Sequence, residues 1–227
     1  MPTRGKKPPE PLPPLEVLTS EQARVWKALA EPSREWNAYL AGGAGLAIHL
    51  RHRQSKDFDW FTRSTVEPSK ILSDVTQTGL HLDRLMQNTI GSFHAIVSGT
   101  EVSLFRYPYP ILEPSTTWEG GELASILDIA AMKISALRQR SSKRDFVDLC
   151  VLITSTPYTL EDMLVAFGRK YQVRPIEALE GLTYFSPIDK AMMPFMLIDI
   201  RWPKIRSIIE LAVATLDRSR LQTIPLR

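Results

Sequence analysis

Residues 39–61 read YLAGGAGLAIHLRHRQSKDFDWF, and this stretch decides the fold. The short apolar run at 36–41 predicts a buried strand. The glycine-rich residues 42–45 predict a turn into a helix, and Leu46, Ala47 and Leu50 form its apolar stripe. The chain is therefore expected to contain a strand, a glycine turn and a helix in direct succession.

The end of the same stretch alternates between acidic and aromatic residues. Because successive side chains of a strand point to opposite faces, Asp57 and Asp59 share one face with Phe61, and Phe58 and Trp60 share the other. Glycine N–H groups at a helix start attract phosphate, and paired carboxylates suit Mg²⁺. Alone, a Gly-Gly pair is more often a plain turn and Asp-x-Asp a solvated strand edge, but their succession favours a nucleotide triphosphate site.

Composition excludes several classes of protein. The chain has 227 residues, of which 44% are hydrophobic and 23% charged, with a formal net charge of +3. These values predict a soluble folded protein and do not by themselves indicate nucleic-acid binding. A single cysteine, Cys150, excludes an internal disulfide, and no Cys/His cluster has zinc-site spacing.

Nothing in the sequence predicts a membrane segment or a secretion signal. The first 14 residues contain six prolines and lack the apolar centre of a signal peptide. The longest mostly apolar stretch, 191–200, is shorter than the roughly 20 residues that span a bilayer. We therefore expect a cytoplasmic protein with no membrane partner.

The remaining pattern predicts an α+β fold that ends in a helical bundle. Elements expected before residue 123 are a helix over 19–30 with a capping box at Thr19 and Gln22 and an end at Pro32, a helix opened by Pro68, a possible strand at 81–86, and strands at 93–97 and 102–107. From Ser125 onward only helices are expected. We interpret the chain as a flexible basic arm (1–18), an α/β core (19–122) and a helical domain that completes a cleft (123–227).

Common catalytic motifs are missing from the sequence. It contains no GxxxxGK[ST] phosphate loop, no HExxH, no GxSxG and no GxGxxG fingerprint. The usual ATPase, protease and esterase classes are thereby excluded.

Three blocks of sequence resemble one known family. They are residues 39–61, the segment Phe105-Arg106-Tyr107-Pro108-Tyr109-Pro110, and residues 128–149 with Asp128-Ile129-Ala130-Ala131-Met132-Lys133 and Arg144-Asp145-Phe146-Val147-Asp148-Leu149. Together they resemble the nucleotidyltransferases of AbiEii/AbiGii-type toxins, within the polymerase-β-like superfamily. The resemblance covers residues 36–153 and implies a polymerase-β-like core with a mixed sheet.

The resemblance also implies a set of site residues. Gly42, Gly43 and Ser55 would face the triphosphate of an NTP substrate, and Asp57 and Asp59 would hold Mg²⁺. Lys133 and Asp145 would complete the catalytic site. Arg53 is a further candidate for nucleotide binding, although an arginine near a helix end also complements the helix dipole.

Several alternatives remain open at these positions. Lys133 could be solvated, or paired with Asp145 or Asp148 from the next helix. Asp145 is preferred for the site, which leaves Asp148 to cap its helix or to pair with a basic neighbour (Arg140, Lys143 or Arg144). His49 and His52 are more readily surface or supporting residues than metal ligands.

One position departs from the pattern of the superfamily. Many of its members place a third carboxylate on a later central strand, where this chain has Ser103. Glu101, on the same strand face, or Asp145 could supply the missing charge.

The resemblance implies transfer of a nucleotide from an NTP to an acceptor. The acceptor could be the 3′ end of tRNA or another RNA, and the protein could be the toxin of a type IV-like toxin-antitoxin pair with a cognate antitoxin. Two alternatives are a catalytically silent nucleotide- or RNA-binding module and a nucleic-acid-binding regulator. The latter would use the basic arm and the four basic residues Arg138, Arg140, Lys143 and Arg144.

Overall fold

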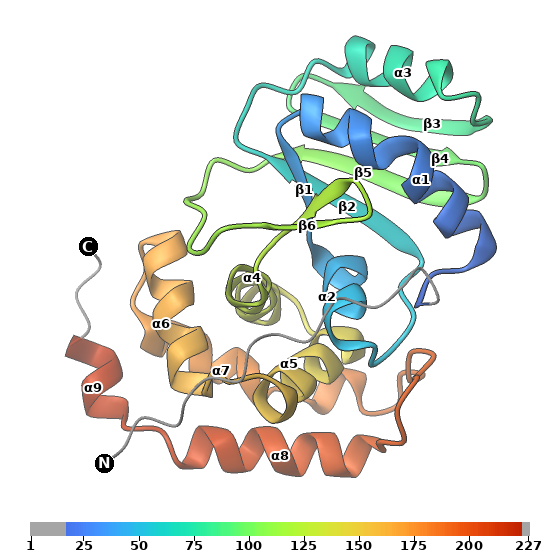
Figure 1. Ribbon diagram of the computed structural model, residues 1–227. Coiled ribbons are helices and arrows are strands. Elements are labelled where there is room, and N and C mark those ends of the chain that lie inside the picture. The colour runs from blue at the N-terminus through green and yellow to red at the C-terminus, as the bar shows by residue number, and fades with distance from the viewer. Residues whose placement is uncertain (1–16, 224–227) are drawn as a thin grey trace.

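The computed structural model describes residues 17–223, and within them seven strands form one mixed sheet. Its order is β3-β4-β5-β2-β1-β7-β6 (Figure 1). The strands are β1 (Ala38–Leu40), β2 (Asp57–Thr62), β3 (Leu82–Thr89), β4 (Ser92–Val97), β5 (Thr100–Arg106), β6 (Thr116–Trp118) and β7 (Gly121–Leu123). The two central strands, β2 and β5, are parallel, and their register pairs Asp59 with Ser103.

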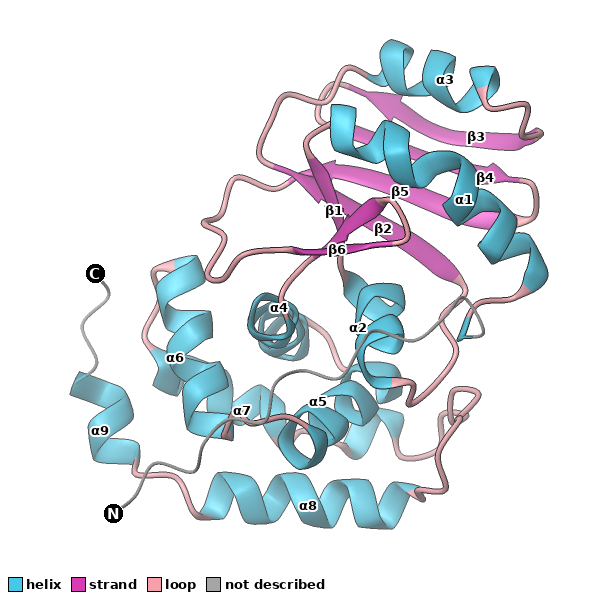
Figure 2. Cartoon of the chain, viewed as in Figure 1, coloured by secondary structure: helices cyan, strands magenta, loops and turns pink. Residues whose placement is uncertain are grey.

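Helices surround this sheet and fill the C-terminal half (Figure 2). The α-helices are α1 (Ser20–Glu35), α2 (Gly42–Leu50), α3 (Pro68–Gln77), α4 (Ile126–Gln139), α5 (Lys143–Ser155), α6 (Leu160–Tyr171), α7 (Leu179–Leu182), α8 (Trp202–Ala214) and α9 (Arg218–Thr223). Short 3₁₀ turns lie at Pro175–Ala178 and Ser186–Ile188. None of the helices in residues 17–223 combines the length and apolar character that crossing a membrane requires.

The alternation predicted for β2 is confirmed, and it gives the sheet two different faces. Phe58 and Trp60 are completely buried in the core that the sheet forms with α1 and α3. Trp26 of α1 stacks on Trp60, with ring centroids 6.0 Å apart. The three residues that alternate with them, Asp57, Asp59 and Phe61, are only partly buried because they lie on the opposite face.

Helix α1 begins as predicted but ends later. Thr19 and Gln22 form the expected capping box. The predicted end at Pro32 is wrong, since the helix continues to Glu35. A proline ring removes only one helical N–H donor near the end of a helix, and the Trp36 N–H still donates to the Pro32 carbonyl at 3.2 Å.

Other short elements also differ from expectation. Strand β1 has three residues instead of six, and α2 begins at Gly42 without a separate turn before it. Strands β6 and β7 were not predicted, because three residues are too few for a periodic pattern. The remaining predicted strands and the helix after Pro68 are confirmed within a few residues.

The C-terminal half is a helical bundle packed around α4. Helices α5, α6 and α7 contact α4, and α8 packs on α5 (Figure 1). No strand follows Leu123 in the part of the chain that the structure describes, and Cys150 is a buried free thiol. The division at residue 122 stays a prediction. Most of the proposed arm lies outside the described residues, and its last two residues, Val17 and Leu18, are buried against the sheet core.

Candidate functional site

The first turn of α2 lies directly against the second carboxylate of β2. Gly42 has φ +60°, and a Cβ on it would lie 2.8 Å from Asp59 Oδ2. A Cβ on Gly43 would lie 2.7 Å from Ser55 Oγ and 2.8 Å from Arg53 Nη2. No side chain caps this helix start, so its first N–H groups are free to meet an anion. Only glycine keeps the space between the helix start and the strand open.

Asp57 and Asp59 carry excess negative charge into this space. Burial raises the pKa of both carboxyls, and the neighbouring acids add to it: Glu101 for Asp57, and Asp57 for Asp59. The nearest cation is Arg144, whose Nη1 lies 3.8 Å from Asp57 Oδ2. No hydrogen bond or ion pair reaches the Asp59 carboxylate from residues 17–223. This surplus of carboxylate oxygen attracts a hard cation.

Lys133 reaches the same space from α4 and is held there by two acids of α5. Its Nζ lies 2.8 Å from Asp145 Oδ1 and 2.6 Å from Asp148 Oδ2. Burial alone would lower the pKa of Lys133, but the two carboxylates outweigh it and the pKa is raised. Of the two alternatives left open for Lys133, solvation is wrong because the side chain is buried, and pairing is confirmed with both Asp145 and Asp148. Lys133 also lines the cavity described below.

Asp148 does not pair with the basic residues at the start of its helix, as one alternative had it. It is completely buried and accepts hydrogen bonds from His52 Nε2 at 2.8 Å and from Arg53 Nε and Nη2 at 2.6 and 2.8 Å. Burial would raise the pKa of Asp148, but Lys133, Arg53 and His52 hold it well below the ordinary range. His52 is thus an interior supporting residue and not a surface one.

The two acids of α5 therefore have different surroundings. Asp145 Oδ1 accepts the Lys133 bond, and Asp145 Oδ2 is buried without a hydrogen-bond partner. Arg140 Nε lies 3.6 Å from that oxygen, too far for a hydrogen bond. Asp145, which lines the cavity, thus keeps one carboxylate oxygen without a hydrogen bond.

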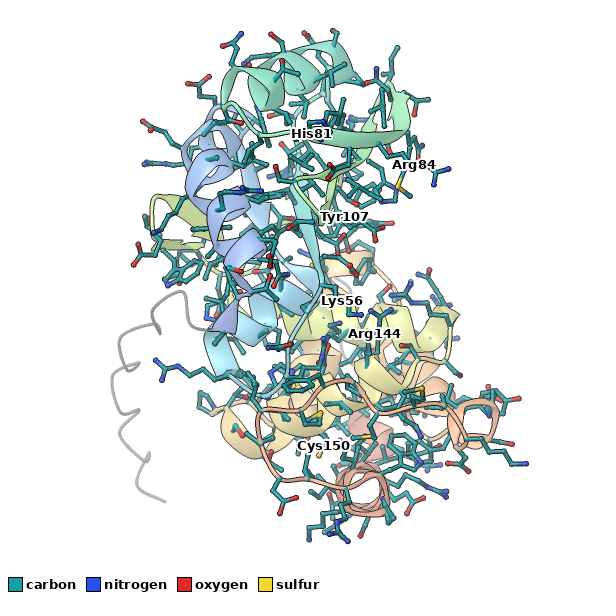
Figure 3. All side chains as sticks on the ribbon, turned by 90° about the vertical axis from the view of Figure 1, so that its right-hand side faces the viewer. Lys56, His81, Arg84, Tyr107, Arg144 and Cys150 are labelled. Atoms are coloured by element: carbon teal, nitrogen blue, oxygen red, sulfur yellow. The ribbon has the colours of Figure 1, made fainter. Side chains whose placement is uncertain are left out.

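A cavity of about 480 Å³ between the sheet and α4–α5 brings all eight predicted site residues together. They are Gly42, Gly43, Arg53, Ser55, Asp57, Asp59, Lys133 and Asp145. In Figure 3, Tyr107, Lys56 and Arg144 follow one another from the sheet toward the helices on the face turned to the viewer. Strand β2 and helices α4 and α5 are far apart in the sequence. They meet at the cavity because α4 and α5 pack onto α2, which itself contacts β2.

The position next to Asp59 has no third carboxylate. Ser103 is its register partner on β5, and Glu101 lies beside Asp57 but is hydrogen-bonded to His94 Nε2 at 2.6 Å. No group of three or more His, Cys, Asp or Glu side chains in residues 17–223 is arranged to hold a metal ion. A metal at this site would therefore rest on Asp57 and Asp59 and take its other ligands from substrate and water.

Several lining residues were missed by sequence reasoning. Phe61, Tyr107 and Tyr171 form an aromatic wall, and Arg144 lies beside Asp57. Alternation on β2 already put Phe61 on the face of the two aspartates, which was an available signal. Tyr107 and Tyr171 are 64 residues apart, and no local pattern connects them. Their hydroxyl groups are hydrogen-bonded to each other.

The four basic residues at the α4–α5 junction do not form one surface patch. Lys143 is buried, and its Nζ donates to the carbonyls of Asp189 and Ala191 at 2.9 and 2.6 Å. Arg138 pairs with Glu177 at 3.2 Å. Only Arg140 and Arg144 stand at the cavity.

Comparison with known sequences finds a relative of this chain in Aquifex aeolicus. The chain is 35% identical over 156 residues to the uncharacterized protein aq_aa25 of Aquifex aeolicus, covering 65% of this chain and 73% of that protein. The chain belongs to the same family as this Aquifex protein. No protein-family model matches it.

Solved structures of other proteins share its fold. A proposed nucleotidyltransferase from H. pylori has a TM-score of 0.61 at 16% identity, over 87% of this chain and 95% of its own. JHP933 from Helicobacter pylori has a TM-score of 0.59 at 17% identity, over 89% of this chain and 97% of its own. MenT4, a nucleotidyltransferase toxin from Mycobacterium tuberculosis, has a TM-score of 0.55 at 11% identity, over 90% of this chain and 89% of its own. The chain therefore has the nucleotidyltransferase fold that the sequence predicted, with a mixed sheet followed by helices.

Proposed function

We propose that this protein is a nucleotidyltransferase that transfers a nucleotide from an NTP to a hydroxyl acceptor. One observation carries the proposal: a glycine helix start, two aspartates, a lysine and a third aspartate, from four separate elements, line one cavity. The fold shared with nucleotidyltransferase structures supports the same reaction class. Fold alone does not establish function, so the side chains of the cavity carry the assignment.

The cavity supplies groups for each part of a bound triphosphate. The free N–H groups at the start of α2 and the Ser55 hydroxyl would bind phosphate oxygens. Arg53 and Lys133, both held in place by Asp148, would oppose the phosphate charge from fixed positions. Because these cations are already ordered, little would need to rearrange when substrate binds.

The residues present fit a divalent cation. Asp57 and Asp59 share a strand face, have raised pKa values and lack a close cationic partner apart from Arg144. We assign them as the residues that would hold Mg²⁺. When bound, Mg²⁺ neutralises charge on the phosphates and on the departing pyrophosphate.

The proposed reaction is an in-line displacement at the α-phosphorus. The acceptor oxygen forms a bond to phosphorus, the bond to the bridging oxygen breaks, and pyrophosphate leaves with that electron pair. The proton of the acceptor hydroxyl passes to a carboxylate, for which we assign Asp145 Oδ2, the buried oxygen without a partner. Lys133 would hold Asp145 in orientation through its bond to Oδ1.

The narrower assignment concerns the acceptor and the biological role. We infer an RNA acceptor, with the 3′ end of tRNA as the first candidate, and a toxin role with a cognate antitoxin. The resemblance to AbiEii/AbiGii-type toxins and the fold shared with the toxin MenT4 support this assignment. Arg140 and Arg144 at the edge of the cavity supply positive charge for an RNA backbone.

The test is transfer of label from NTPs to RNA. Purified protein is incubated with each labelled NTP, Mg²⁺ and total RNA, beside Asp57→Ala and the control Asp199→Ala, an exposed aspartate outside the cavity. We expect wild type and Asp199→Ala to label RNA equally and Asp57→Ala to lose at least about 100-fold. Equal labelling by all three proteins, or none by wild type with any NTP, would contradict the proposal.

One observation favours a second function on the same fold. Ser103 occupies the register position beside Asp59 where a third carboxylate would stand, which suits a module that binds nucleotide without transferring it. Calorimetry with Mg²⁺ and NTP, combined with a pyrophosphate assay, separates the two. A silent module binds NTP but releases no pyrophosphate with any RNA. The enzyme binds NTP and releases pyrophosphate when its RNA acceptor is present.

A further inference from the structure

The cavity has two chemically different ends along strand β2. Asp57 lies toward Arg144, Asp59 lies in the middle beside Gly42, and Phe61 lies at the other end. Side chains two residues apart on a strand are separated by about 7 Å along it. The phosphate-binding groups and the first aromatic ring are therefore separated by roughly the span of a ribose.

Three aromatic side chains, Phe61, Tyr107 and Tyr171, form what we call the aromatic end. Phe61 and Tyr107 meet edge to face with ring centroids 5.1 Å apart, and Tyr107 and Tyr171 lie 6.4 Å apart. They come from β2, the segment after β5, and α6 respectively. The aromatic end therefore connects the sheet to the helical half.

The rings of the aromatic end are held firmly in place. The hydroxyls of Tyr107 and Tyr171 are hydrogen-bonded to each other, and Tyr109 packs on both rings with centroids 4.8 and 4.7 Å away. Burial raises the pKa of Tyr107 and of Tyr171, so both phenols are neutral at pH 7. An apolar, uncharged and preordered wall costs little entropy to bind against.

Polar groups lie within reach of this wall. Ser135 and Gln139 of α4 also line the cavity, and the Gln139 side-chain amide donates to Ser135 Oγ at 3.2 Å. A flat heteroaromatic ring with a polar edge matches such a surface, because its face packs on aromatic rings while its edge meets hydrogen-bonding groups.

We propose that the aromatic end is a nucleobase subsite, in which the base of the NTP packs on Phe61 and the Tyr107–Tyr171 pair. This inference rests on the proposed function, because it assumes that the acidic end holds the phosphates. It assigns three residues that the sequence motifs left without a role. It also predicts that the base contributes to affinity separately from the triphosphate.

The test compares a ligand that has a base with one that has none. Calorimetry in Mg²⁺ measures the affinity of the four NTPs and of inorganic tripolyphosphate for wild type, Phe61→Leu and Phe105→Leu. Phe105 is the control for repacking around the subsite, because its ring packs on Phe61 with centroids 5.9 Å apart but does not itself line the cavity. Leucine keeps apolar bulk at both positions and removes the ring.

We expect wild type to bind its preferred NTP more tightly than tripolyphosphate. Phe61→Leu should weaken that NTP about tenfold and leave tripolyphosphate unchanged, and Phe105→Leu should change neither. Unchanged tripolyphosphate affinity also demonstrates that the variant is folded. A loss for both ligands, if melting curves report a folded variant, would mean that Phe61 acts through the acidic end and would overturn the subsite.

The other outcomes separate this inference from the proposed function. If NTP and tripolyphosphate bind wild type equally, or Phe61→Leu keeps NTP affinity within twofold, the subsite is wrong and the phosphate site stands. If NTP binding responds to Phe61→Leu but no RNA is labelled, the transfer reaction is wrong and the subsite stands. If wild type binds neither ligand, both are wrong.

Discussion

At the scale of single residues, Asp148 organises the cationic side of the cavity. Its two carboxylate oxygens meet Arg53, His52 and Lys133, all at 2.8 Å or less. A buried carboxylate with this many donors is satisfied, and its partners are held in single orientations. Asp148 is the ion-pair partner of buried Arg53 and one of the two ion-pair partners of buried Lys133.

We predict that Asp148→Asn destabilises the protein by about 3–5 kcal/mol at pH 7, because it leaves buried cations without their counter-charge. The pKa of Asp148 is depressed in the folded state, so its stabilisation is present above the ordinary aspartate range and is lost as pH falls through the folded-state pKa. Urea unfolding at a series of pH values measures the free energy of unfolding of wild type and of Asp148→Asn. The difference between wild type and variant should shrink toward low pH.

The control for this experiment is Asp199→Asn, which changes an exposed carboxyl. Its stability should stay within about 0.5 kcal/mol of wild type at every pH. An Asp148→Asn protein as stable as this control at pH 7 would show that the buried cations do not depend on Asp148.

At the scale of elements, the start of α2 defines the acidic end of the cavity. The helix begins without a side-chain cap, and two glycines keep its first turn close to β2 and to Ser55. A capping side chain would satisfy the free N–H groups and would also occupy the space in front of them. The absence of a capping side chain destabilises the start of α2 locally, and it leaves the free N–H groups open to an anion.

We predict that Gly43→Ala weakens Mg²⁺–NTP affinity about tenfold and destabilises the fold by about 1–3 kcal/mol. The added methyl would lie 2.7 Å from Ser55 Oγ and 2.8 Å from Arg53 Nη2, and Asp148 prevents Arg53 from moving aside. Gly168→Ala is the matched control, since its Cβ would lie 2.9 Å from Pro175 Cγ, away from the cavity.

Calorimetry and urea unfolding on both variants test this prediction. Both should lose stability, and only Gly43→Ala should lose affinity. Equal NTP affinity of the two variants would mean that the first turn of α2 does not contact the phosphates.

At the scale of the whole molecule, a buried ion pair ties the segment after β5 to the helical half. Lys170 Nζ lies 2.6 Å from Asp128 Oδ1 and donates to the Pro110 carbonyl at 2.7 Å. Asp128 also accepts from the backbone N–H groups of Leu112 and Glu113, each at 3.1 Å. This network positions the segment that carries Tyr107, and with it the aromatic end.

We predict that Lys170→Met lowers the free energy of unfolding by about 3–5 kcal/mol, because Asp128 then stays buried without its cation. The control is Arg220→Met, which breaks an exposed pair with Glu161 and should cost less than about 1 kcal/mol. Urea unfolding measures both. Similar small losses would show that the Lys170–Asp128 pair does not hold the two halves together.

Much of the fold followed from local patterns. The capping box at Thr19, the alternation of β2 and the helix opened by Pro68 depend on neighbouring residues, and the structure contains all of them. The eight predicted site residues also meet in one cavity, although their roles stay predictions. The end of α1 and strands β6 and β7 could not be predicted, because packing outweighs weak local signals there.

The amino-acid sequence by itself determined which side chains share a face, since strand and helix periods are set by backbone geometry. On that ground it put Asp57, Asp59 and Phe61 together beside a glycine helix start. Only the tertiary structure decided that Asp148 is enclosed by cations while Asp145 keeps one oxygen without a hydrogen bond, and that Tyr107 meets Tyr171. These choices depend on how distant elements pack, and a contact across 64 residues has no local period to reveal it.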